Sequence, residues 1–137
     1  MNKHPYLRAY MAGIVVPTIF LLVILTFFCV ARFVYQVGVP IERIIMFPMA
    51  VVPNLWGFWN MLYVAVQSRR RLPIGFHGAV LPFVLAPLAY AVANALDFVI
   101  PRYVASGFPI GFPVALILYY LAWKYLVGFF NEVLGIA

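Results

Sequence analysis

The sequence predicts an all-α integral membrane protein with four transmembrane helices, and three observations support this fold class. Of the 137 residues, 67% are hydrophobic and only 9% are charged, and the mean hydropathy is +1.07. A soluble domain carries about a quarter charged residues. Four apolar segments each reach the roughly 20 residues that a helix needs to cross a bilayer. The connections between them are too short to hold a soluble domain, so we expect one membrane domain over residues 1–137.

The first predicted span covers residues 11–31 and is closed by Arg32. Lys3 and Arg8 precede it, as basic residues precede the core of a signal peptide. The apolar run is longer than the 7–15 residues of a secretory core, however, and no A-x-A cleavage site follows it. We therefore expect an uncleaved first helix. The other three spans are predicted at residues 44–68, 76–100 and 108–130.

The orientation is predicted from the lysines and arginines, which gather on the cytoplasmic side of membrane proteins. Arg69, Arg70 and Arg71 lie between the second and third spans. They predict that this connection is cytoplasmic. With four spans, both termini are then cytoplasmic as well, an N-in and C-in arrangement in the plasma (inner) membrane.

The side chains that catalysis and metal binding require are scarce. Cys29 is the single cysteine, so neither a disulfide nor a thiolate metal site can form within the chain. His4 and His77 are too few for a haem with two histidine ligands or for a zinc or copper cluster. Three acids are present, Glu42, Asp97 and Glu132, whereas an intramembrane aspartyl peptidase needs two carboxylates in one site. We expect no enzyme activity, no cofactor and no metal.

Two polar residues near the ends of spans are expected to be interfacial. His77 begins the third span, and we expect its imidazole to lie at the membrane surface. Lys124 lies inside the fourth span between Trp123 and Tyr125, where a lysine can extend towards the headgroups beside aromatic residues. The net charge of +6 reflects cytoplasmic lysine and arginine, so no nucleic-acid partner is expected.

The second and third predicted spans are interrupted by prolines in the same pattern. The stretches FPMAVVPNLWGFWN (47–60) and LPFVLAPLAYAVAN (81–94) each carry two prolines five residues apart and end on an asparagine. A proline inside a helix removes a backbone hydrogen bond and kinks the helix. We expect both spans to be bent, and two interpretations of this pattern stay open.

The first interpretation is packing. On a helical wheel, one face of the second span gathers Trp56, Trp59, Asn60 and Tyr63. One face of the third span gathers Ala86, Ala89 and Ala93. Small residues permit close helix contact in lipid. The two spans are therefore predicted to form an antiparallel pair in which the aromatic face covers the alanine face, so that a leucine at Ala89 would force the helices apart.

The second interpretation is transport. Secondary transporters place broken helices around a cavity lined by freed backbone groups. Asn60, Asn94 and Asp97 would line such a path here, and a carboxylate inside a membrane suggests function by default. The two asparagines differ in depth, however, at about 18 and 33 Å from the connection between the spans. Asp97 lies near the outer end of its span, with Arg102 five positions on, which favours an interfacial role.

Two functions of different class follow from these interpretations. The first is a structural or accessory subunit without a catalytic site, which acts by helix packing in a homo- or hetero-oligomeric membrane assembly. The second is a small ion or solute transporter or channel. The partners expected for the first are the lipid bilayer and either a second copy of the chain or a larger membrane complex.

Overall fold

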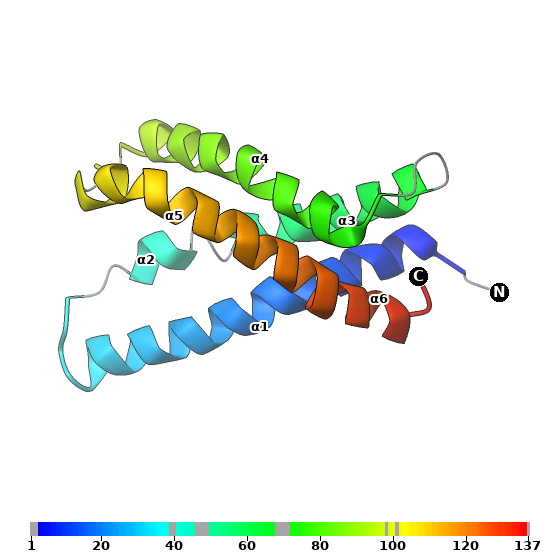
Figure 1. The fold of residues 1–137 in the computed structure, drawn as a ribbon. Coiled ribbons are helices and arrows are strands. Elements are labelled where there is room, and N and C mark those ends of the chain that lie inside the picture. Colours follow the sequence, from blue (N-terminus) through cyan, green and yellow to red (C-terminus); the bar gives the residue numbers. More distant parts are fainter. Residues whose placement is uncertain are drawn as a thin grey trace.

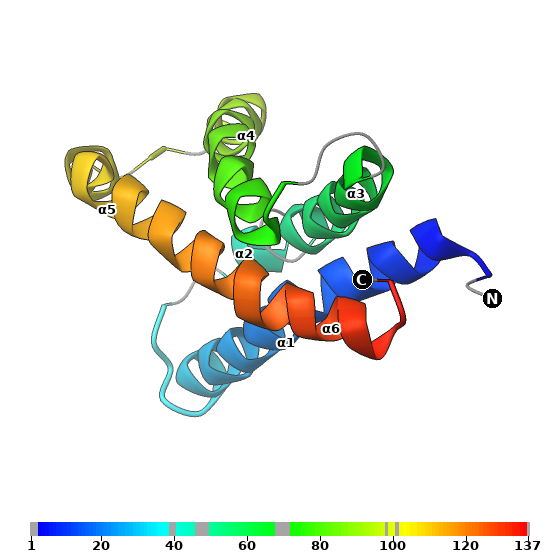
Figure 2. The same cartoon turned by 45° about the vertical axis from the view of Figure 1, so that its right-hand side comes forward.

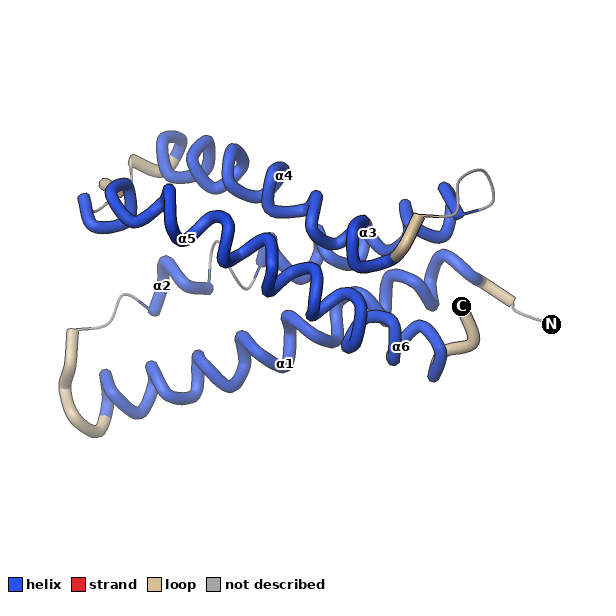
Figure 3. The backbone as a smooth tube through the Cα atoms, in the orientation of Figure 1, coloured by secondary structure: helices blue, strands red, loops and turns tan. Residues whose placement is uncertain are grey.

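The structure is a computed structural model that describes residues 3–38, 41–45, 50–67, 72–97, 99–100 and 102–136, with the backbone alone at 43 and 44. Every regular element within these ranges is a helix (Figures 1 and 3). Arg69, Arg70 and Arg71, on which the predicted orientation depends, lie outside the described residues.

The first helix, α1 (Pro5–Phe33), is 29 residues long and extends beyond the predicted span of 11–31 at both ends. Pro5 is its first residue. The N–H of a first helical residue makes no hydrogen bond within the helix, so proline is well tolerated there. Near its other end, Arg32 donates a hydrogen bond of 2.6 Å to Glu42 in the short helix α2 (Ile41–Ile44). This hydrogen bond from the guanidinium holds the pKa of the exposed Glu42 carboxyl below its usual range.

The third helix, α3 (Ala50–Gln67), packs more extensively against α1 than against any other helix. Two glycines make this contact close. A Cβ on Gly13 would lie 2.5 Å from the carbonyl oxygen of Trp56, and a Cβ on Gly57 would lie 2.4 Å from the ring of Tyr10. Because small residues let helix backbones approach each other in lipid, the sequence at these two positions selects α1 as the main neighbour of α3.

The fourth helix, α4 (Ile74–Ala95), lies along a long helical run that begins with α5 (Arg102–Leu121). The run continues through a π-helical turn, Ala122–Val127, which we call the π segment, and ends in α6 (Gly128–Val133). Gly78 of α4 lies against Trp123 of the π segment, since a Cβ at Gly78 would lie 2.0 Å from the indole Cγ. This contact holds α4 to the π segment.

Three of these helices are long and apolar enough to cross a membrane: Pro5–Phe33, Ile74–Ala95 and Arg102–Val133. They correspond to the first, third and fourth predicted spans, although the predicted third span extended to residue 100 whereas α4 ends at Ala95. The described part of the second predicted span, α3, is not among the three and contains Asn54, Asn60 and Gln67.

The helices converge at one end of the molecule and diverge at the other (Figures 1 and 2). The start of α1, the end of α6, the end of α3 and the start of α4 lie together at the converging end. At the opposite end α1 runs away from α4 and α5, and Figure 2 shows that the end of α4 and the start of α5 also spread apart there.

The buried core lies where α3, α4 and the π segment meet. It consists of Trp56, Leu81, Leu85, Trp123 and Val127. In contrast, α5 has no buried residue along its 20 positions. Tight packing is therefore confined to the half of the molecule at the converging end.

Candidate functional site

The most enclosed polar group in the described part of the chain is a set of three hydrogen-bonded partners, which we call the amide cluster. It comprises Asn60 of α3, Asn131 of α6 and the backbone carbonyl of Ala9 in α1. Asn60 Nδ2 donates to the Ala9 oxygen at 2.7 Å and to Asn131 Oδ1 at 2.7 Å, and Asn131 Nδ2 donates back to Asn60 Oδ1 at 3.1 Å. Both side chains are fully buried. The cluster therefore ties three helices together with interhelical hydrogen bonds.

A second polar link joins α3 to α4 through Trp59 and His77. Trp59 Nε1 donates to the His77 carbonyl at 2.7 Å, and His77 Nε2 lies 2.7 Å from the Trp59 carbonyl. Because a carbonyl only accepts hydrogen bonds, Nε2 of the imidazole carries a proton. The rings of Trp59, Tyr63 and Trp123 lie 5.0, 5.3 and 5.8 Å from the imidazole, centroid to centroid. His77 is thus buried among aromatic rings in the first turn of α4.

Trp123 of the π segment is also buried. Its side chain is fully enclosed, its ring lies 5.3 Å from that of Trp56, and its indole N–H has no acceptor among the described residues. Lys124, the next residue, is exposed as expected, with its ammonium 5.9 Å from the ring of Tyr120 and 5.2 Å from that of Tyr125.

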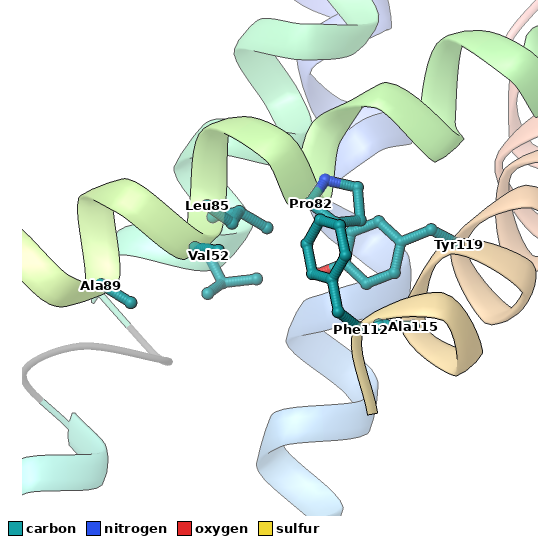
Figure 4. Close-up of a pocket in the computed structure, with 8 residues that line it drawn as sticks. Val52, Pro82, Leu85, Ala89, Phe112, Ala115 and Tyr119 are labelled. Carbon is teal, nitrogen blue, oxygen red and sulfur yellow. The ribbon is translucent and has the colours of Figure 1, made fainter. Parts of the chain in front are cut away.

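The structure separates most of the predicted aromatic face from the predicted alanine face. Trp56 contacts Tyr119 and Trp123 of the long C-terminal run. Ala86 and Ala89 line an open apolar groove of about 250 Å³, and Phe112 and Tyr119 line its wall on α5 (Figure 4). Ala93 is half-buried further along α4. The α3–α4 contact that the sequence predicted is present near the converging end, where Trp59 and Tyr63 meet His77.

The three residues of the predicted transport path do not come together. Asn60 is enclosed in the amide cluster, whereas Asn94 and Asp97 are exposed at the diverging end. Asp97 follows the end of α4 with a left-handed backbone (φ 54°), and its N–H donates to the Asn94 carbonyl at 3.3 Å. Aspartate adopts this conformation more readily than most residues, so Asp97 ends the helix rather than lying within it.

A larger apolar cleft lies between α1 and the long C-terminal run. Its volume is about 750 Å³, and Phe20 of α1 and Leu118 and Leu126 of the run are among the residues that line it. Val52 and Tyr119 line both this cleft and the smaller groove. The walls of both spaces are almost wholly apolar, so neither is suited to bind an ion.

The described residues contain no group of three or more histidine, cysteine or acidic side chains that could hold a metal ion. Comparison of the chain with protein-family models, curated proteins and solved structures yields no match. The site must therefore be interpreted from its own chemistry, which is that of interhelical packing and hydrogen bonding.

Sequence reasoning overlooked two sets of residues that the structure makes prominent. The first is Asn131, which lies four residues after Val127 and eight after Trp123, and all three are buried. This spacing places them on one face of a helix and could have indicated that Asn131 is buried. Gly107 and Gly111 form a G-x-x-x-G motif in α5, a pattern typical of helix association in membranes.

Proposed function

We propose that this protein is a non-catalytic integral membrane subunit that acts by packing its transmembrane helices against those of another chain. The partner is a second copy or a larger membrane assembly. The observation that carries the proposal is the uncovered G-x-x-x-G motif of α5. A Cβ added at Gly107 or Gly111 would meet no described atom within 4 Å, so the face on which a neighbouring helix could pack closely is free.

The absence of buried residues along α5 supports the same function. Although α5 packs along α4, none of its side chains is buried, so much of its surface stays uncovered by its own chain. Lipid tails are as apolar as leucine, so van der Waals packing at small residues and interhelical hydrogen bonds drive helix association in membranes. Gly107 and Gly111 supply such a packing site on a face of α5 that its own chain leaves uncovered.

The proposal includes four spans with both termini in the cytoplasm and bends at the prolines of the second and third spans. Pro53 lies within α3, and Pro82 and Pro87 lie within α4. The two chain ends lie at the same end of the molecule (Figure 1), in keeping with an even number of spans. The triple arginine at 69–71 assigns that end to the cytoplasm.

Transport is the alternative, and it requires a hydrated path that reaches Asn60, Asn94 or Asp97. Asn60 is fully buried and its carboxamide is hydrogen-bonded to two partners. Such bonding favours a structural role for this asparagine over a role in binding a solute.

The test of association is the mass of the protein purified in a mild detergent. We expect particles heavier than the 15.5 kDa chain, and we expect Gly107→Leu with Gly111→Leu to shift them to the single-chain mass. Ala105→Leu, an exposed substitution on the opposite face of α5, is the matched control and should leave the mass unchanged. A wild-type particle that holds one chain and no other protein would reject the proposal. Flux through proteoliposomes that Asp97→Asn abolishes would establish the alternative.

The orientation is tested separately by thiol labelling from outside the cell in a Cys29→Ala background. Ser106→Cys should react, and Asn2→Cys should react only after the membrane is opened. Reaction at Asn2→Cys alone in intact cells would reverse the proposed orientation.

A further inference from the structure

His77 is a buried titratable side chain that lies near one end of the molecule. It is the fourth residue of α4, about 5 Å from the start of that helix at 1.5 Å per residue. The start of α4 lies at the converging end, where both ends of the chain also lie (Figure 1). Only 8% of the residue is exposed. A proton from the water at this end therefore has a short path to the buried imidazole.

The imidazole belongs to a link between α3 and α4, which we call the histidine latch and which consists of Trp59, Tyr63, His77 and Trp123. Trp59 and His77 each hydrogen-bond to the backbone carbonyl of the other, at 2.7 Å in both cases. The three aromatic rings lie around the imidazole. Elsewhere α3 packs far less against α4 than against α1. The latch therefore supplies much of what holds α3 to the start of α4.

Only one nitrogen of the imidazole takes part in the latch. Nε2 donates its hydrogen to the Trp59 carbonyl, so Nδ1 of the neutral ring carries a lone pair. Within the part of the chain that the structure describes, no side chain hydrogen-bonds to Nδ1. A second proton would therefore bind at Nδ1 and give the ring a positive charge.

None of the titratable groups around the ring could balance this charge. In the described residues of α3, α4 and the π segment, the titratable side chains other than His77 are Tyr63, Tyr90, Lys124 and Tyr125. The Lys124 ammonium is itself positive and lies over the rings of Tyr120 and Tyr125, at 5.9 and 5.2 Å. The elements that surround the imidazole thus offer it no carboxylate.

The three acids of the chain lie elsewhere. Glu42 pairs with Arg32, Asp97 is exposed at the diverging end, and Glu132 is exposed on α6. None of them forms an ion pair with His77. The arginines at 69–71, which precede α4 and lie outside the described residues, add only positive charge. A protonated His77 would therefore be an unpaired buried cation.

We propose that His77 is a proton-operated latch, which fastens α3 to the start of α4 while its ring is neutral and releases it when Nδ1 takes up a proton. A charge removed from water costs free energy unless it is paired. Stacking on the Trp59 indole offsets part of that cost, but the imidazolium regains its hydration only by moving out to the water at the converging end. That movement breaks the hydrogen bond to the Trp59 carbonyl. The proposal does not depend on association with another chain.

The test is amide hydrogen exchange of the purified protein in detergent, between about pH 5 and pH 8, where histidine titrates. The wild type is compared with His77→Gln at each pH, which removes the intrinsic pH dependence of exchange. Glutamine can donate to the Trp59 carbonyl but takes up no proton in this range. In residues 77–81 we expect similar rates for both proteins at pH 8. At pH 5 the wild type should exchange up to about 30-fold faster, since each pH unit below about 6.5 shifts such an equilibrium at most tenfold.

His4→Gln is the matched control, because it removes the only other histidine of the chain at an exposed position before α1. This variant should keep the full response. It also keeps the test decisive if His77→Gln does not fold. A response that begins between about pH 6 and 7 lies between the titration ranges of the carboxyl and α-amino groups, so in the absence of His4 it belongs to His77.

Three outcomes would overturn the proposal. In the first, wild-type exchange in residues 77–81 follows that of His77→Gln at every pH. In the second, the response disappears in His4→Gln, which would assign it to the residue before α1. In the third, exchange rises equally in residues 9–16 of α1, where Gly13 packs against Trp56; this would indicate unfolding of the whole protein by acid instead of release of α4.

Discussion

At the scale of single residues, the amide cluster shows how two asparagines are accommodated in an apolar interior. Each carboxamide in the pair both donates and accepts, and the spare N–H of Asn60 reaches the Ala9 carbonyl. A buried polar atom without a partner costs more free energy than the hydrogen bond itself contributes. The two asparagines therefore depend on each other more than either contact energy suggests.

The first prediction tests this dependence. Asn131→Leu should lower the free energy of unfolding by about 1–2 kcal/mol, because it leaves the Asn60 oxygen without a donor. Combining it with Asn60→Leu should cost less than the sum of the two single changes, since no amide then remains unpaired. The measurement is thermal unfolding in detergent. Asn94→Leu, exposed on α4, should have little effect, and strictly additive single changes would refute the coupling.

The second prediction concerns the close approach of α1 and α3. Gly13→Ala places a methyl group against the backbone of Trp56, at 2.5 Å from the carbonyl oxygen, and the backbone has little freedom to move away. We expect a loss of about 1–3 kcal/mol, the usual cost of overpacking. Gly128→Ala is the matched control, because its Cβ would lie 3.6 Å from the nearest atom, the carbonyl oxygen of Trp123, which is an ordinary contact. An alanine in place of a helical glycine there should stabilise the helix by about 0.5–1 kcal/mol. Equal melting temperatures for the two variants would contradict the predicted close contact.

At the scale of the helices, the π segment keeps the buried face of the C-terminal run aligned. Trp123, Val127 and Asn131 are spaced by four residues, and all three are fully buried. In an α-helix each such step overshoots a full turn by about 40°. In the wider π segment, with i→i+5 hydrogen bonds, four residues fall short of a turn, so the two steps offset each other. The π segment thus directs Asn131 towards Asn60 while Trp123 still faces α4.

The third prediction reverses an expectation from the sequence. If Ala89 packed beneath a tryptophan, leucine at this position would separate the helices. In the structure Ala89 lines the open groove of about 250 Å³ and has room beside it, so Ala89→Leu should leave the melting temperature unchanged or raise it by an amount equivalent to about 0.5–2 kcal/mol. Ala91→Leu, exposed on the same helix, is the control. A destabilisation confined to Ala89→Leu would restore the sequence-based arrangement.

The fourth prediction concerns the ion pair between α1 and α2. Because the pKa of Glu42 is lowered in the folded chain, the pair stabilises the fold above the unfolded value of 4.5 and is lost as the pH falls through the lower folded pKa. Glu42→Gln should therefore speed amide hydrogen exchange in residues 41–45 at neutral pH, and high salt should do the same to the wild type because the pair is exposed. Exchange that responds to neither change would show that the pair does not hold α2.

At the scale of the whole molecule, the sequence predicted the helices well and their neighbours poorly. Hydropathy located three long spans because each is a run of apolar residues, yet it placed the end of the third at residue 100 instead of Ala95. The helix ends at Ala95, and Asp97 just beyond it has a left-handed backbone conformation that hydropathy does not register. The neighbours of α3 were harder to predict, since α4 follows α3 directly in the sequence whereas the glycines that join α3 to α1 lie 44 residues apart, at positions 13 and 57.

The sequence identified Asn60 as a polar residue of the candidate site but did not identify the residues that hydrogen-bond to it. Asn60 was recognised as a polar residue inside a span, but its partner lies 71 residues away on a helix considered only for its lysine. Contacts between distant positions depend on how the helices cross, and helical periodicity within one segment carries no information about that crossing. The contacts that bury His77 and Trp123 were not predicted, for the same reason.

The amide cluster also has a consequence for the order of events during synthesis. Asn60 and Asn131 are 71 residues apart, and a ribosome adds about 5–20 residues per second. The Asn60 carboxamide therefore exists for roughly 4–14 s before its partner is made. During that interval α1 and α3 can already lie together in the membrane, with an acceptor oxygen that no part of their own chain yet occupies. We expect stable assembly with another chain only after α6 has been inserted and has taken up that oxygen.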